Sequence, residues 1–394
     1  MLPLVDHHCH GVTREALDRA GFEAFISEGG PPAPGATNFD TPVGLAIRRH
    51  CAPVLDLPVH APPLDYLARR TELGVAEVTR RLLTASGTQR FCIDTGFHPA
   101  GLTTPDELAA FAGGSPGSAR EIVRLESVAE ALAADGVDAG EFAERFAVAL
   151  DGTIRSRGAV GVKTIAAYRV GFDLNPVRPA SAEIAEAAGR WLRRGPDGER
   201  GWRLDDAVLT RYLLWCAVDH GLPIQFHVGF GDADIRMHRV DPSLLTDWLH
   251  QHRVPVMLLH CWPYQRRAAF LATVHPHVHL DLGLTLTYVG PARAAAVLAE
   301  VLELTPFGKM LYSSDAYGVP ELYHLAALAF RRGLAQVLQE RVATGEWAAP
   351  DAVRVARWIG RGNAVRVYGF ESAMQGDPDL DAGGDGDGVV LGDT

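Results

Sequence analysis

The sequence lacks the long apolar runs and the cysteine patterns that mark membrane-spanning and disulfide-stabilised proteins. It contains no run of about eighteen apolar residues, the length a transmembrane helix needs. The first residues carry no charged and apolar signal regions, so we expect a cytoplasmic protein. The five cysteines are odd in number, widely spaced and never in a C-x-x-C pair. This spacing argues against a disulfide framework or a cysteine zinc cluster.

An excess of positive charge is also absent, since 37 Lys and Arg residues stand against 48 Asp and Glu residues and the formal net charge is −11. Nucleic acids and anionic membranes bind positive surfaces, so neither is an expected partner. The charge is uneven, because residues 376–394 contain six aspartates and no Lys or Arg. We therefore predict a folded domain over residues 1–373 and an acidic, disordered tail over residues 374–394. P-loop and dinucleotide-binding fingerprints are missing as well.

The remaining sequence has the composition and periodicity of an α/β protein. With 47% hydrophobic and 22% charged residues, the chain can bury a full core. Short apolar, β-branched runs alternate with Ala/Leu/Arg-rich stretches of helical spacing, which predicts a parallel sheet. Eight such runs predict a distorted (β/α)8 TIM barrel. The runs cover residues 3–10, 90–96, 120–126, 159–165, 223–228, 255–260, 277–282 and 310–315.

Two connections are too long for a simple strand-to-helix unit. The connection after the first run spans about residues 11–89 and holds a helical insertion at about 25–88. The connection after the fourth run spans about residues 166–222. Insertions after barrel strands lie over the active-site face, so we expect both to shape substrate access.

Metal-type side chains recur where the predicted strands end. His8 and His10 alternate on the first run, so they share one face. The fifth, sixth and eighth runs end at His227, His260 and Asp315. A single histidine at a strand end is readily explained by a hydrogen bond that caps the strand. Four strand ends of this kind are harder to explain that way, and in a barrel they meet at one mouth.

Three neutral imidazoles and a carboxylate are a suitable ligand set for Zn²⁺ or a similar ion. Such an ion lowers the pKa of water from about 15.7 to about 7. Asp315 is then positioned to act as general base. His260 is left to polarise a substrate oxygen or to protonate a leaving group.

Longer segments around these residues also form recognisable motifs. They are Asp6–His10, Val162–Arg169, Phe226–Asp232, Leu259–Tyr264, Ser313–Glu321 and Asn363–Tyr368. Together they resemble the amidohydrolase superfamily, and within it the amidohydrolase-2 branch, over about residues 3 to 370. The FluG-type and nodulin/glutamine-synthetase amidohydrolase domains are the more similar members. The branch also contains aminocarboxymuconate-semialdehyde decarboxylase.

The resemblance implies roles for individual residues. It implies His8, His10, His227 and Asp315 as metal ligands and His260 as a catalytic residue. Zn²⁺ is the expected ion, with Mn²⁺ or Fe²⁺ as alternatives. One ion is favoured, and two would require a carboxylated lysine at position 163.

Three roles are open for Lys163. It is a carbamate that bridges two metal ions, an unmodified cation that binds a substrate carboxylate, or an ordinary lysine whose side chain extends out of the barrel. We favour the second. Other candidate substrate-binding residues stand near predicted strand ends. They are Arg124, Glu126, Arg169, Trp262 and Tyr317. Ion pairs inside the barrel explain the charged members nearly as well, and packing explains the aromatic ones.

We therefore expect a metal-dependent hydrolase that cleaves an amide, lactam or ester bond in a small carboxylate-bearing molecule. Non-oxidative decarboxylation is the alternative, because the same branch contains decarboxylases, and release of carbon dioxide would distinguish it. A non-catalytic scaffold stabilised by metal is a third hypothesis. Barrels of this kind often pair, so a homodimer is the expected assembly if the chain oligomerises.

Overall fold

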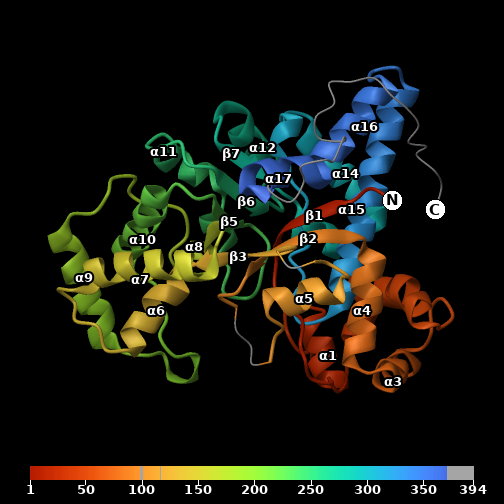
Figure 1. Ribbon diagram of the computed structural model, residues 1–394, viewed down its shortest axis with the longest axis horizontal. Helices are drawn as coiled ribbons and strands as arrows, with labels where there is room; N and C mark the ends of the chain where they lie inside the picture. The colour runs from red at the N-terminus through yellow and green to blue at the C-terminus, as the bar shows by residue number, and fades with distance from the viewer. Residues whose placement is uncertain (98–100, 116, 371–394) are drawn as a thin grey trace.

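The computed structural model describes residues 1–97, 101–115 and 117–370 and is built around one sheet of seven parallel strands (Figure 1). The strands follow one another in sequence order, each paired with the next. Parallel neighbours need crossover connections, and helices supply them here. The strands are β1 (Leu4–Cys9), β2 (Thr88–Asp94), β3 (Ala119–Arg124), β4 (Gly161–Thr164), β5 (Ile224–Val228), β6 (Val256–His260) and β7 (Val278–Leu280).

The eighth predicted strand, residues 310–315, is present as an extended segment and not as a regular strand. Leu311 N donates to Leu280 O of β7 over 3.0 Å, and Asp315 N donates to His8 O of β1 over 3.0 Å. The segment therefore bonds to both edges of the sheet and closes it into a barrel-type ring.

A side chain explains why this segment is irregular. The Asp6 carboxylate accepts hydrogen bonds from Ser314 N at 3.0 Å and from Ser314 Oγ at 2.5 Å. Asp315 then turns away with a φ of 51°. These side-chain bonds replace part of the strand ladder and direct the Asp315 side chain into the ring.

Helices fill both predicted insertions. Between β1 and β2 lie α1 (Arg19–Phe25), α2 (Pro42–Ala46), α3 (Pro63–Leu73) and α4 (Val75–Ser86), with short 3-10 and π turns at Asn38–Asp40, Ile47–Cys51 and Ala52–Leu55. Between β4 and β5 lie α8 (Ala166–Arg169), α9 (Ser181–Arg194) and α10 (Ala207–His220), with a 3-10 turn at Gly198–Arg200. In Figure 1 the two groups lie on opposite sides of the sheet.

The remaining helices connect successive strands or close the chain. They are α5 (Pro105–Phe111), α6 (Leu125–Ala134), α7 (Phe142–Arg157), α11 (Thr246–Leu249), α12 (Gln265–Val274), α13 (Gly283–Val289), α14 (Pro291–Leu302), α15 (Pro320–Ala343), α16 (Ala349–Arg357) and α17 (Asn363–Tyr368). Further 3-10 or π turns cover Met237–Arg239, Pro242–Leu245, Phe307–Lys309 and Trp358–Gly362. Among the described helices, none has the length and apolarity needed to span a bilayer.

The helices pack onto the sheet through buried apolar side chains. One cluster joins the outer faces of β3 to β7 to helices such as α10 and α14, and includes Phe226 and Trp248. A second joins β1 and β2 to the first insertion through Phe39 and Tyr66. The predicted acidic tail at residues 374–394 lies outside the described residues.

Candidate metal centre

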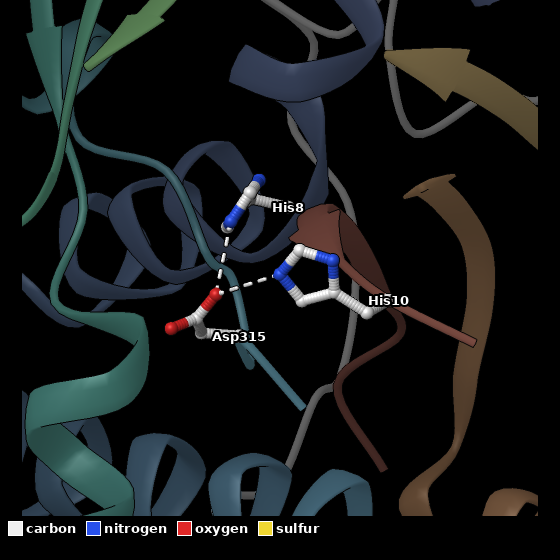
Figure 2. Close-up of side chains that lie close together, drawn as sticks. All are labelled: His8, His10 and Asp315. Atoms are coloured by element: carbon white, nitrogen blue, oxygen red, sulfur yellow. Dashed lines mark ion pairs between the residues drawn. The ribbon is translucent and has the colours of Figure 1, made fainter. Parts of the chain in front are cut away.

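Three of the predicted ligands converge inside the ring, as Figure 2 shows. His8 Nε2 lies 2.9 Å and His10 Nε2 3.5 Å from Asp315 Oδ1. Among the described residues, His8, His10 and Asp315 are the group whose ligand atoms lie within 4.8 Å of one another. All three side chains are buried. A strand that starts the chain and a segment 300 residues later thus meet at one point.

The tautomer of His8 is fixed by Gln225, which no motif had singled out. Gln225 Nε2 donates to His7 O at 2.7 Å and to Tyr368 Oη at 2.9 Å. The amide oxygen of Gln225 therefore faces His8 Nδ1 at 2.8 Å, and that nitrogen must donate. The other ring nitrogen, Nε2, is left with a bare lone pair aimed at Asp315.

His10 is oriented in the same way by the backbone. Its Nδ1 donates to Asp94 O at 3.0 Å, which leaves Nε2 as the acceptor nitrogen. Asp94 is held in turn by Arg124, whose Nη2 donates to Asp94 Oδ2 at 2.6 Å. Burial opposes ionisation of Asp94, but the Arg124 charge outweighs it and holds the Asp94 pKa below its usual value.

Two bare imidazole nitrogens and a carboxylate oxygen facing one point repel one another unless a cation lies between them. Burial, aided by the charge of Lys163, lowers the pKa of His8 to about 3, so its ring is neutral at pH 7. Burial alone would raise the pKa of Asp315, but His260, His10 and His8 outweigh it and keep the carboxyl ionised. A neutral-imidazole and carboxylate set of this kind fits a divalent transition metal.

His260 lies beside this group with an unsatisfied ring. Its Nε2 is 3.4 Å from Asp315 Oδ2, and neither ring nitrogen has a hydrogen-bond partner among the described residues. Asp281 fixes the backbone, because its Oδ1 accepts from His260 N at 2.8 Å. His260 and Cys261 both adopt positive φ, 67° and 63°. Such strain in non-glycine residues is typical of functional sites.

A hydrogen-bond chain links the closing helix to both halves of the site. Tyr368 of α17 contacts His7 Nδ1 at 3.0 Å, and His7 Nε2 donates to Asp281 Oδ2 at 2.8 Å. Through Gln225, the same tyrosine hydroxyl supports His8. Rotations of the His8 and His260 regions are therefore restrained by one buried network.

His227, the fourth predicted ligand, lines the same cavity but stays outside the three-residue group. Its Nε2 lies 2.9 Å from Phe230 O and 3.0 Å from Tyr168 Oη. The ring is close to His260, with 4.6 Å between centroids. Hydrogen-bonding neighbours thus occupy Nε2 of His227, and a role as metal ligand stays a prediction.

Lys163 is fully inside the site. Its Nζ lies 3.2 Å from His8 Nε2, where an ammonium can donate to the bare nitrogen. Burial lowers the Lys163 pKa to about 8, although Asp94 and Asp315 act in the opposite direction. Among the described residues no carboxylate lies within 4.0 Å of this nitrogen. Lys163 is therefore a buried cation available to a ligand.

His10 and Asp315 of the metal group line a cavity of about 360 Å³. Cationic side chains on the cavity wall include Arg124, Arg169 and Arg203, and Tyr317 also lines it. Glu28, from the first insertion, faces the same space; burial and the charges of Asp315 and Asp232 raise its pKa to about 8. The cavity suits a small polar molecule.

Two predicted substrate-binding residues are placed elsewhere. Glu126 lies in the first turn of α6, and its Oε1 accepts from Thr164 Oγ1 at 2.6 Å and from Ile165 N at 3.0 Å, so it supports the end of β4. Trp262 is 39% exposed and packs against Phe230. Neither is among the described residues that line the cavity.

Several residues of the site were missed in the sequence. Gln225 lies two positions before His227 on β5, so strand alternation puts both on one face. Asp281 directly follows β7, as Asp315 ends its own segment. Gln225 and Asp281 could have been found in the sequence, because each is a polar residue within or directly after a buried strand. His7 and Tyr368 gave no comparable signal.

Gly229 lies where the segments that follow β5 and β6 approach each other closely. It has a φ of 77°, and a Cβ there would lie 2.0 Å from Trp262 O. Gly229→Ala is expected to lower the free energy of unfolding by at least about 3 kcal/mol, because backbone overlap adds to the left-handed strain. Gly221, with a φ of 70° and open space, is the control. Gly221→Ala should cost about 1–2 kcal/mol. Urea unfolding would measure both, and equal costs would contradict the close approach.

Comparison with known proteins places this arrangement in context. A family model described as Amidohydrolase matches residues 93–370. Protein fluG of Emericella nidulans is 26% identical over 93% of this chain. The chain spans 45% of the length of that relative.

Two solved structures are similar to this chain over most of its length. A protein of Lactobacillus casei, described as a metal-dependent hydrolase, is 28% identical with a TM-score of 0.80, covering 95% of this chain and 96% of its own. A glucuronate isomerase of Caulobacter crescentus shares the fold, with 14% identity, a TM-score of 0.63 and coverage of 94% and 92%.

Proposed function

Because the chain belongs to the amidohydrolase family, we propose that it is a metal-dependent hydrolase of an amide, lactam or ester bond in a small carboxylate-bearing molecule. The observation that carries the proposal is the convergence of His8, His10 and Asp315 on one point beside the cavity that His10 and Asp315 line, with both histidine tautomers set by hydrogen bonds behind them. Similarity to a metal-dependent hydrolase structure supports it.

The residues that would hold the ion are His8, His10 and Asp315, and His227 is the nearest further candidate. A divalent ion held by these residues would polarise a substrate carbonyl and would lower the pKa of a water molecule. Zn²⁺ is the ion we favour, since imidazole nitrogen is a preferred ligand for it.

The protein's own groups supply the proton transfers. Asp315 is ionised, and its Oδ2 is directed toward His260, so it can accept a proton from an attacking water molecule. Burial lowers the pKa of His260, so the neutral ring can donate a hydrogen bond from Nε2 to a developing oxyanion. Low solvent exposure strengthens both interactions.

Lys163 is the group we assign to the substrate carboxylate. The guanidinium of Arg124 is paired with Asp94, and that of Arg203 with Asp234 at 3.0 Å. Lys163, in contrast, has no carboxylate partner among the described residues, and it lies next to the metal group. An ammonium there attracts an anionic substrate and places the scissile bond near Asp315.

The test is a panel of paired compounds, each an acid and its uncharged methyl ester, incubated with the protein before and after chelation. We expect hydrolysis of some of the acids, its loss with chelator and its return with Zn²⁺ or Mn²⁺. In Lys163→Met the KM for the acid should rise about 10- to 100-fold, the value of a charged hydrogen bond, whereas turnover of the uncharged partner should change little. Release of carbon dioxide as the product, or full activity in the chelated protein, would contradict the proposal.

A further inference from the structure

Two His-x-His motifs precede the amino ends of β6 and β7, whereas the proposed metal centre lies at the carboxyl ends of the strands. His250 and His252 lie between α11 and β6, just before the amino end of β6. His275 and His277 lie between α12 and β7, just before the amino end of β7. The proposed centre, in contrast, is built on residues at the carboxyl ends, such as His260.

The four rings are paired across the two motifs. The centroids of His250 and His275 are 5.0 Å apart, and those of His252 and His277 are 5.3 Å apart. The His275 and His277 centroids are 5.9 Å apart. Two imidazoles that share a tetrahedral zinc at a Zn–N distance of about 2.0–2.1 Å have centroids about 5 Å apart. His8 and His10, the predicted ligands, show 5.1 Å.

The inner pair of rings is buried without satisfying partners. His252 is 8% and His277 6% exposed. Among the described residues, both nitrogens of His252 lack a hydrogen-bond partner, and those of His277 have at most a weak contact with the backbone of Leu249. Buried polar atoms of folded proteins are rarely left unsatisfied, so these nitrogens are available to a ligand.

The charges around the motifs define which ligand fits. Among the described residues, no carboxylate forms an ion pair with the four rings, and the nearest cations bond to backbone: Arg253 to His252 O and Lys309 to His275 O. Burial lowers the pKa of His252 and of His277 to about 4, so both rings are neutral at pH 7. Neutral imidazoles suit Zn²⁺, Ni²⁺ and Cu²⁺ and not the oxygen-seeking Mg²⁺ or Ca²⁺.

We propose that the two motifs form a second binding site, for one divalent transition-metal ion, between the loops that precede β6 and β7. It is separate from the proposed catalytic centre and does not depend on it. The ring nitrogens of the four histidines do not form a group of three within 4.8 Å, as His8, His10 and Asp315 do, so binding requires rotation of one or more rings. His250 is exposed and gives an ion access from solvent. The bound ion would tie these two loops together.

The test is calorimetric titration of ZnCl₂ into the full chain carrying His8→Ala and His10→Ala, which removes the first centre. We expect one ion per chain with a Kd of about 10 µM or tighter. Adding His250→Gln and His275→Gln should weaken binding at least tenfold, whereas adding His238→Gln, an exposed histidine outside the motifs, should leave it unchanged. No zinc binding by the background chain, or equal binding in both derivatives, would overturn the proposal.

A second measurement does not depend on whether the variant with His8→Ala and His10→Ala folds. In the otherwise unchanged protein, saturation with Zn²⁺ should give one more bound ion per chain than in the variant with His250→Gln and His275→Gln. Equal counts would contradict the second site. If the unchanged protein bound zinc at the second site but not at His8 and His10, the proposed function would be contradicted and the second site would stand. The two failures are therefore distinguishable.

Discussion

Replacing Asp315 by Asn is expected to lower kcat/KM at least about 10⁴-fold, because general-base catalysis alone contributes about 10²–10⁴-fold and a metal ligand is lost with it. Asn keeps the size of the side chain but removes the charge that faces His8 Nε2 at 2.9 Å. Retained metal should fall by one ion per chain, as measured by elemental analysis after dialysis. Activity should be measured with the substrate that the compound panel identifies.

Asp232→Asn is the matched control for this variant. Asp232 lines the same cavity, so the substitution removes the same charge from the same space, but it lies outside the group formed by His8, His10 and Asp315. The Asp232 variant should keep its full metal content. Equal loss of metal in both variants would mean that the general negative charge of the cavity, and not coordination by Asp315, retains the ion.

Gln225→Leu is expected to damage both stability and metal binding. The substitution leaves His8 Nδ1 and His7 O without the buried partner that Gln225 supplies, at about 1–3 kcal/mol for each unpaired group, and the Tyr368 hydroxyl, which still bonds to His7 Nδ1, loses one hydrogen bond. We therefore expect the free energy of unfolding of the metal-free chain to fall by about 3–5 kcal/mol. Metal affinity should fall about 10- to 100-fold, because His8 loses the bond that sets its tautomer.

Urea unfolding in chelator and competitive metal titration measure these two effects separately. Gln265→Leu serves as the control, since the one side-chain hydrogen bond of Gln265 among the described residues is donated by Nε2 to Glu300 at 2.6 Å. It should cost about 1 kcal/mol and leave metal affinity unchanged. A Gln225 variant that bound metal as tightly as the unchanged chain would show that His8 does not need this support.

The fold and three of the site residues could be predicted because buried strands, and the polar residues at their ends, are recognisable in the sequence. The amidohydrolase resemblance and the barrel-type α/β fold are confirmed, because buried parallel strands leave a strong apolar pattern and their carboxyl ends converge. His8, His10 and Asp315 stood out for the same reason, as metal-type side chains that end or nearly end such runs. Their meeting point follows from topology alone.

The parts that could not be predicted depend on side-chain geometry. The regularity of residues 310–315 is lost to the Asp6–Ser314 bonds, which no periodicity indicates. Glu126 is turned into the start of α6 by its bonds to β4. The hydrogen bond of His227 to Phe230 depends on the turn after β5. Each outcome is decided by local hydrogen bonding and not by the apolar pattern.

The most direct test of the metal centre is a crystal of the full chain grown with Zn²⁺ and measured at wavelengths on either side of the zinc absorption edge. The account predicts an anomalous peak about 2.0–2.2 Å from His8 Nε2, His10 Nε2 and an Asp315 oxygen. A fully zinc-loaded crystal with no peak between these three side chains would contradict it.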